Sequence, residues 1–359
     1  MDIRSFFQIM VEREASDMFL RTNAVPRVRV HGVVKPISEE VVTMEEMLGI
    51  ADKLLATEDR KRRYRENLDI DFVHYEQGIG RFRINIFTQR NTPALVARHV
   101  HTSVKNFKDL GLPEDLLKTF CENKSGLVIL SGPAGSGKST TIASMIEYIN
   151  NNYEKHIVTI EDPIEFLFKD KKSMINQREL ESDVHTYPKA LKHVTQQSPD
   201  IIYIGNIRDV ETMHAAITAT ELGALVLTTF HTVNSVQAVT RIVNFFPPYL
   251  HDEVRMQLSV ILKGIVSLRL IPRLDKEGRV PAFETMVVTP TIARLIREGK
   301  VNEIQSFIDE GDLFGMTSFK KCLVTLVKGG VVDEDEARSV ADSKDEFNLE
   351  LRGVKRYIK

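Results

Sequence analysis

The sequence has few cysteines and no long apolar run, and both absences limit what the protein can be. Its two cysteines, Cys121 and Cys322, lie far apart and form no metal-ligand pair, and their scarcity fits a reducing compartment. The longest apolar stretch, residues 260–271, is interrupted by Lys263 and Arg269 and falls short of the roughly 20 residues that span a bilayer. The first residues also lack a signal-peptide pattern. We therefore expect a cytoplasmic protein with no direct membrane insertion.

A strong excess of charge of either sign is also missing. The formal net charge is -2 at pH 7, which argues against a protein that coats nucleic acid. The only dense basic run, at residues 60–65, has acidic neighbours and lies in a predicted helix. This pattern favours an exposed, ion-paired helix face over a site for nucleic acid or anionic lipid, so we expect no nucleic-acid partner.

The apolar pattern divides the 359 residues into parts of different character. Residues 1–99 combine helical spacing with an alternating strand at 80–87, which predicts a small α+β domain. A looser stretch, residues 100–113, is the predicted linker. In residues 114–288 helices alternate with short apolar strands, at 127–130, 156–160, 201–204 and 225–229, which predicts an α/β domain whose parallel sheet is covered on both faces. Residues 289–359 are predicted to be mostly helical.

A glycine-rich turn follows the first of these strands. Residues 132–140 read GPAGSGKST and fit the phosphate-cradling pattern G-x-x-x-x-G-K-[ST]. Glycines let backbone N–H groups close around phosphate oxygens, and the following helix adds its positive dipole end. The predicted nucleotide-binding residues are Gly132, Ala134, Gly135, Ser136, Gly137, Lys138, Ser139 and Thr140. Lys138 would reach the outer phosphates and the Ser139 hydroxyl would bind Mg²⁺, so the motif predicts ATP and Mg²⁺ as ligands.

Acidic residues follow the second predicted strand, in the sequence EDPIE at 161–165. Carboxylates at the end of such a strand face the crevice where α/β sheets bind ligands, and they are suited to hold magnesium-bound waters or orient an attacking water. The same residues also fit a helix start, with Asp162 as the N-cap, Pro163 as the first helical residue and Glu165 three residues after the cap. From the residues alone both interpretations stay open.

Several further motifs occur in a characteristic order, at residues 16–20, 78–83, 89–91, 159–166, 176–179, 199–209, 230–232 and 315–319. With the glycine-rich turn, they make essentially the whole chain resemble the PilT/PilU family, the retraction-type motor ATPases of type IV pili. The sequence also lacks any C-x-x-C pair, unlike the pilus-extension and type II secretion relatives. The resemblance implies a PAS-like N-terminal domain joined to a RecA-like P-loop ATPase domain, assembled as a hexameric ring.

The resemblance also assigns roles to residues. Glu161 would orient the attacking water, and His231 would sense the γ-phosphate, although a lone histidine after a strand is otherwise a structural hydrogen-bonder. Arg81 would reach a neighbour's triphosphate, the alternative being a solvated strand face. Asn206 stands where most members have glutamate, and Ala224 where they have histidine. Both changes suggest weakened hydrolysis. Three interpretations stay open: the enzyme turns over slowly, the acidic residues at 161–165 carry the chemistry, or the replacement was made deliberately to trap bound nucleotide.

The implied function is an ATPase motor that drives pilus retraction and twitching motility. Its implied partners are further copies of itself in a homo-hexamer, the inner-membrane pilus platform protein, through which it is peripheral at the inner membrane, and a sibling retraction ATPase. The alternative is a nucleotide-binding accessory subunit with weak or no hydrolysis. This alternative is motivated by Asn206, by Ala224 and by residues 290–298. The last segment matches the family's helix only in Leu-Ile-Arg-Glu. A RecA-like nucleic-acid translocase is a further rival that the charge opposes.

Overall fold

A computed structural model describes residues 2–30, 32–100, 103–180 and 182–353. The chain forms two compact units, one of Met1–Ser103 with Glu165–Leu167, and the other of Val104–Ile164 with Phe168–Lys359. The predicted linker, residues 100–113, includes His101 and Thr102, which lie outside the described residues, as do residues 354–359 of the predicted helical part. None of the helices in the described residues has the length and apolarity needed to cross a bilayer.

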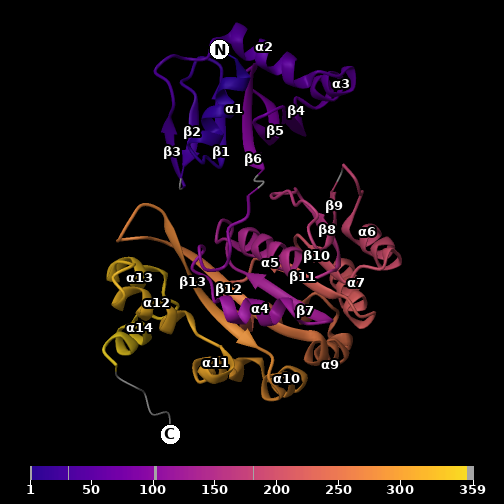
Figure 1. The fold of residues 1–359 in the computed structure, drawn as a ribbon, viewed down its shortest axis with the longest axis vertical. Helices are drawn as coiled ribbons and strands as arrows, with labels where there is room; N and C mark the ends of the chain where they lie inside the picture. The colour runs from indigo at the N-terminus through magenta and orange to yellow at the C-terminus, as the bar shows by residue number, and fades with distance from the viewer. Residues whose placement is uncertain (1, 31, 101–102, 181, 354–359) are drawn as a thin grey trace. The chain divides into compact units, whose positions relative to one another are not determined.

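The first unit is an antiparallel sheet with three helices. Its elements are α1 (Ile3–Glu12), β1 (Asp17–Arg21), β2 (Arg27–Val30), β3 (Val33–Pro36), α2 (Met44–Leu55), α3 (Glu58–Asn67), β4 (Asp69–Glu76), β5 (Gly80–Gln89) and β6 (Thr92–Val100) (Figure 1). The strand order is β3-β2-β1-β6-β5-β4. On β5 the alternation predicted from the sequence is confirmed, since Phe82, Ile84 and Ile86 are buried in one core with the apolar faces of α1 and α2. The opposite face of β5 carries Arg81 and Arg83.

The second unit is built on a seven-stranded sheet of order β13-β12-β7-β11-β10-β8-β9. Its elements up to β13 are α4 (Glu114–Cys121), β7 (Gly126–Ser131), α5 (Lys138–Asn152), β8 (His156–Glu161), β9 (Met174–Glu179), α6 (Tyr187–Val194), η1 (Thr195–Gln197), β10 (Ile201–Ile204), α7 (Val210–Glu221), β11 (Leu225–Phe230), α8 (Ser235–Asn244), η2 (Pro248–Leu250), α9 (His251–Ile261), β12 (Leu262–Pro272) and β13 (Arg279–Val287). The four predicted strands are β7, β8, β10 and β11, and all are paired in parallel. The long apolar stretch became β12, which pairs antiparallel with β13.

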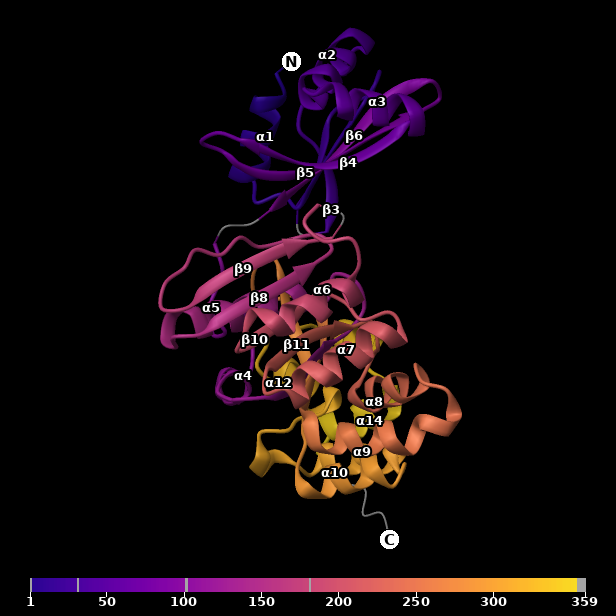
Figure 2. The same ribbon diagram turned by 90° about the vertical axis from the view of Figure 1, so that its right-hand side faces the viewer.

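Both faces of this sheet are covered, as the unbroken apolar strands predict. Alternate strand residues enter two different cores. One core joins residues such as Val128 and Leu130 to α4 and α5, and the other joins Leu127 and Ile129 to α6, α7, α8 and α9. Figure 2 shows α6 and α7 on the opposite side of the sheet from α5. This sandwich fixes the carboxyl ends of β7, β8, β10 and β11 along one edge, where ligands of α/β proteins bind.

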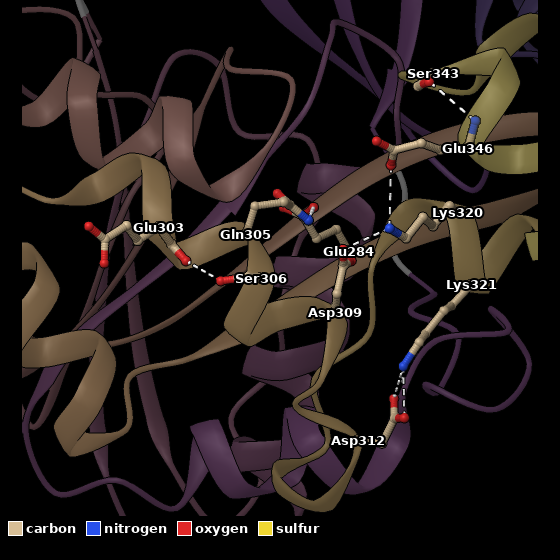
Figure 3. Close-up of polar contacts among 10 residues, drawn as sticks. All are labelled: Glu284, Glu303, Gln305, Ser306, Asp309, Asp312, Lys320, Lys321, Ser343 and Glu346. Atoms are coloured by element: carbon tan, nitrogen blue, oxygen red, sulfur yellow. Dashed lines mark hydrogen bonds and ion pairs between the residues drawn. The ribbon is translucent and has the colours of Figure 1, made fainter. Parts of the chain in front are cut away.

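The chain after β13 is mostly helical, with α10 (Pro290–Arg297), η3 (Val301–Glu303), α11 (Ile304–Asp309), η4 (Asp312–Phe314), α12 (Phe319–Lys328), α13 (Glu334–Val340) and α14 (Lys344–Leu351). Ion pairs connect these helices: the Lys320 ammonium lies 2.7 Å from Asp309 and 3.4 Å from Glu346 (Figure 3). From β12, the Arg269 guanidinium donates to the carbonyls of Val233 and Val340. The same group pairs with Asp342 and stacks on the Phe319 ring.

Candidate functional site

The glycine-rich loop has the backbone conformation that its sequence predicts. It connects the end of β7 to the first residue of α5, and Gly132, Gly135 and Gly137 all have positive φ, of 143°, 73° and 95°. A Cβ at Gly132 would lie 2.4 Å from the Leu268 carbonyl oxygen and 2.5 Å from the Ser136 hydroxyl. A side chain at Gly132 would therefore open the turn.

Lys138 is buried at the centre of this loop, with 7% of its surface exposed. Its ammonium donates to the carbonyls of Gly132 and Pro133, at 2.8 Å each. Ser136 is also buried, whereas Ser139 and Thr140 are half-buried on the first turn of α5. One cation and a helix N-terminus therefore face the same turn, which is the electrostatic arrangement that binds phosphate.

Glu161 ends β8 and is buried, with 5% of its surface exposed. Its Oε1 accepts hydrogen bonds from the Thr159 hydroxyl at 2.6 Å and the Gln177 amide at 3.2 Å. Two neutral donors therefore fix the orientation of this side chain at the strand end.

The alternative of a helix start at Asp162 is wrong. After β8 the chain runs through bends and irregular backbone until β9 begins at Met174. The N–H of Ile164 donates to the Glu179 carboxylate at 3.3 Å, and that of Phe168 donates to the Gln177 side chain at 3.0 Å. Side chains of β9 therefore hold this irregular segment in place of the helix that the capping pattern offered.

Gly205 and Asn206 follow β10, beside the end of β8. The Gly205 N–H donates to the Ile160 carbonyl at 2.8 Å, and Asn206 is half-buried. The two aspartates that bracket this strand have other tasks. Asp200, before the strand, accepts from the His156 N–H at 2.9 Å, and Asp209 caps α7 through the Thr212 N–H at 2.7 Å. Neither takes the place of a carboxylate at Asn206.

His231 directly follows β11, next to the glycine-rich loop. The Gly132 N–H donates to the carbonyl of Phe230 at 3.2 Å, which joins the two segments. Burial, and then the charges of Lys138 and Arg208, lower the pKa of His231. The imidazole is therefore neutral at pH 7 and available as a hydrogen-bonding group beside the lysine.

Ala224 lies at the other end of β11. It is buried in the core and its carbonyl accepts from the Gly126 N–H, at the start of β7. The six residues of β11 separate it from His231, which at about 3.3 Å per residue puts it roughly 20 Å from that end of the strand. Within this chain, the replacement at Ala224 does not touch the glycine-rich loop.

The arginines of the first unit take part in a ladder of charges across its sheet. Asp17 pairs with Arg98 at 3.0 Å and with Arg29 at 3.3 Å, and Arg83 pairs with Asp71. Arg81 is half-buried on β5, opposite Tyr75 and Val100. Its proposed reach to a neighbour's nucleotide stays a prediction.

Known proteins share this fold and this loop. The fold and the loop define a P-loop nucleotide-binding protein, and residues 2–328 match the family described as Type II/IV secretion system protein. The type IV pilus ATPase PilU of Pseudomonas aeruginosa is 37% identical over 98% of this chain and 92% of its own length. The retraction ATPase PilT of the same organism is 37% identical over 97% of this chain and all of its own. The chain belongs to the PilT/PilU family of type IV pilus ATPases.

A solved structure agrees with this family. The crystal structure of the pilus retraction motor PilT with bound ADP superposes with a TM-score of 0.87, at 38% identity, over 96% of this chain and 98% of its own. The fold expected from the sequence, an α+β domain before an α/β domain, is therefore confirmed, and the sheet of the first domain is antiparallel.

Sequence reasoning missed one polar group at this edge of the sheet. Tyr187 begins α6, and its hydroxyl lies beside Gly205 and Glu161. No motif includes Tyr187. The sequence does mark a helix start here: Thr186 caps α6 by accepting from the Lys189 N–H, and Pro188 follows Tyr187. A helix that starts at this point can direct its first side chain at a strand end.

Proposed function

We propose that the chain binds ATP with Mg²⁺ and hydrolyses it as a ring-forming motor that drives type IV pilus retraction and twitching motility. The observation that carries the proposal is the shared edge of the sheet. There the loop after β7, with buried Lys138, and the ends of β8 and β11, with Glu161 and His231, belong to one parallel sheet. The similarity to PilT and PilU over nearly the whole chain supports the pilus system as the place of action.

The residues fit the chemistry of phosphoryl transfer, in which a protein positions water and neutralises charge. The loop amides of residues 132–140 would bind the phosphates, with Lys138 on the outer ones. Ser139 is a hard-oxygen donor of the kind Mg²⁺ prefers, and the ion would supply charge neutralisation on the phosphates. Glu161 orients the attacking water, and neutral His231 reports the γ-phosphate by a hydrogen bond.

The proposed assembly is a homo-hexamer that is cytoplasmic and peripheral at the inner membrane. In it Arg81 reaches the triphosphate of a neighbouring subunit and stabilises the charge that develops there. The proposed partners are the pilus platform protein and a sibling retraction ATPase. Size measurement with and without ATP tests the assembly, and a chain that stays monomeric at micromolar concentration contradicts it.

A second function, a nucleotide-binding accessory subunit with little hydrolysis, is favoured by Asn206 and by the partial match of residues 290–298. An amide next to the acidic residues can hold a water but does not accept its proton. Ala224 gives this alternative no support from within the chain, because it lies at the far end of β11.

Steady-state ATPase rates of the purified chain decide between the two functions. The wild type should exceed Lys138→Ala by at least about 100-fold, because that lysine neutralises the transferred phosphate. A wild-type rate equal to that of Lys138→Ala, together with retained ATP binding, establishes the accessory role. An increase in Asn206→Glu shows that the amide limits turnover.

A further inference from the structure

Buried polar atoms without a hydrogen-bond partner are uncommon in folded proteins, and each one calls for a reason. The described residues hold five such side-chain atoms, on Ser136, Tyr187, Thr232, Asp309 and Ser318. Ser136 is in the glycine-rich loop and Thr232 follows His231, so both belong to segments already assigned to nucleotide. The Tyr187 hydroxyl lies at the same edge of the sheet but belongs to no motif.

The surroundings of this hydroxyl are tightly defined. The Tyr187 ring packs on the core between the sheet and α6. A Cβ at Gly205 would lie 3.1 Å from the hydroxyl oxygen and 3.3 Å from the Cα of Glu161. A side chain at residue 205 would therefore crowd the hydroxyl and the end of β8 by a few tenths of an ångström.

The charges around Tyr187 keep its hydroxyl protonated. Burial, and then the carboxylates of Asp162 and Glu161, raise the pKa of Tyr187 above its ordinary value near 10, while the charge of Arg208 and a hydrogen bond from the Asn206 N–H to the hydroxyl oxygen oppose that shift. The group is thus an O–H donor at every pH of interest, placed next to Glu161 and Asn206. Since these residues give it no acceptor, a bound water is the acceptor that the position suits.

We propose that Tyr187 is a positioning residue of the hydrolytic site, whose hydroxyl donates a hydrogen bond to a water that ties Glu161 to Asn206. This inference rests on the proposed ATPase function. In the reaction the attacking water forms a bond to the γ-phosphorus while the bond from that phosphorus to the β–γ bridging oxygen breaks. ADP leaves with the electron pair, and the water's proton passes to the Glu161 carboxylate. Through the bridging water, Tyr187 fixes the side chains of Glu161 and Asn206, and these two side chains hold the attacking water.

The test is Tyr187→Phe, which removes the hydroxyl and keeps the ring. We expect kcat to fall about 10-fold, the loss of one well-placed hydrogen bond, with an unchanged KM for ATP and an unchanged or higher melting temperature. Tyr249→Phe is the matched control, because that side chain is 82% exposed and should leave kcat unchanged. A kcat of Tyr187→Phe within twofold of wild type overturns the proposal.

A second measurement separates this proposal from the proposed function. The affinity for ADP with aluminium fluoride, which mimics the phosphoryl group in transfer, should weaken about 10-fold in Tyr187→Phe, while ADP affinity stays constant. If wild type does not hydrolyse ATP faster than Lys138→Ala, the proposed ATPase function is wrong. The comparison of analogue affinities still tests the role of Tyr187 in that case. An analogue affinity equal to wild type rejects the role of Tyr187, and a selective loss supports it.

Discussion

The two sheets of the molecule use polar side chains in opposite ways. On the antiparallel sheet of the first unit, Asp17 lies between Arg29 and Arg98, and Arg83 is paired with Asp71. Beside the parallel sheet of the second unit, the hydroxyls of Ser136, Tyr187 and Thr232 are buried near the ligand edge, and none of them donates to an acceptor in the described residues. Satisfied charges stabilise a solvated face, whereas unsatisfied hydroxyls mark a surface shaped for something else to bind.

The register explains why the charges of the first unit must be paired. Arg98 stands directly opposite Arg83 in the β5–β6 ladder, and like charges in that position repel. Asp17, directly opposite Arg98 on β1, and Asp71 on β4 flank this pair and offset the repulsion. The arrangement is therefore a property of the sheet, and it needs no ligand.

The largest expected effect on stability concerns the loop at the ligand edge. Gly132→Ala should destabilise the chain by on the order of 3 kcal/mol, because the new methyl group collides with a backbone carbonyl at positive φ. Gly135→Ala is the matched control: a Cβ there meets no described atom within 4 Å, so only about 1 kcal/mol of left-handed strain remains. Urea unfolding measures both, and equal losses would contradict the geometry.

A second comparison replaces one acid on each sheet. Glu161→Gln should lower kcat by about 10²–10⁴-fold, because the oriented carboxylate that accepts the proton is lost. Asp71→Asn, on the charge ladder, should leave kcat within a few-fold. Single-turnover hydrolysis of ATP checks both variants. If both substitutions reduce kcat alike, the contrast between the two sheets does not hold for function.

The pH dependence tests the neighbourhood of His231. Its folded pKa lies below the usual value, so the unfolded chain takes up its proton first as pH falls through about 6.5. The stability of wild type should therefore drop more than that of His231→Gln between pH 7.5 and 5.5. Saturating ADP should shrink the difference, because phosphate charge stabilises the imidazolium. Melting temperatures measure this, and parallel pH profiles without ADP would contradict the assignment.

The smallest effect belongs to the charge ladder. A double-mutant cycle of Arg83→Ala and Asp71→Ala should give a coupling of about 0.5–1 kcal/mol, since both side chains are partly exposed to water. Urea unfolding at low and high salt is the measurement, and the coupling should fall as salt rises. A coupling of several kcal/mol would mean that this pair is as critical as the ligand edge.

Much of the second unit could be predicted because its signals are local. The strands at β7, β8, β10 and β11 and the loop around Lys138 follow from runs of apolar residues and from glycine spacing. What the sequence did not show depends on distant partners. The segment after Asp162 is irregular, and its N–H groups at Ile164 and Phe168 bond to side chains of the distant β9. Ala224 and His231, close in sequence, lie at opposite ends of one strand.

Tyr187 illustrates the remaining gap. Its chemistry is set by the space at Gly205 and by Glu161 on another strand, neither of which is near it in sequence. An isolated tyrosine at a helix start has no spacing to recognise. Only the assembled sheet brings the hydroxyl to the strand ends.

Arg269 links the segment after His231 to the last helices of the chain. A single guanidinium holds the carbonyls of Val233 and Val340 together. If the Val233 carbonyl moves away, the guanidinium either loses that contact or follows it, and following it lengthens the bond to the Val340 carbonyl. One side chain therefore gives the segment beside the histidine a direct polar contact with α13, some 100 positions later in the chain.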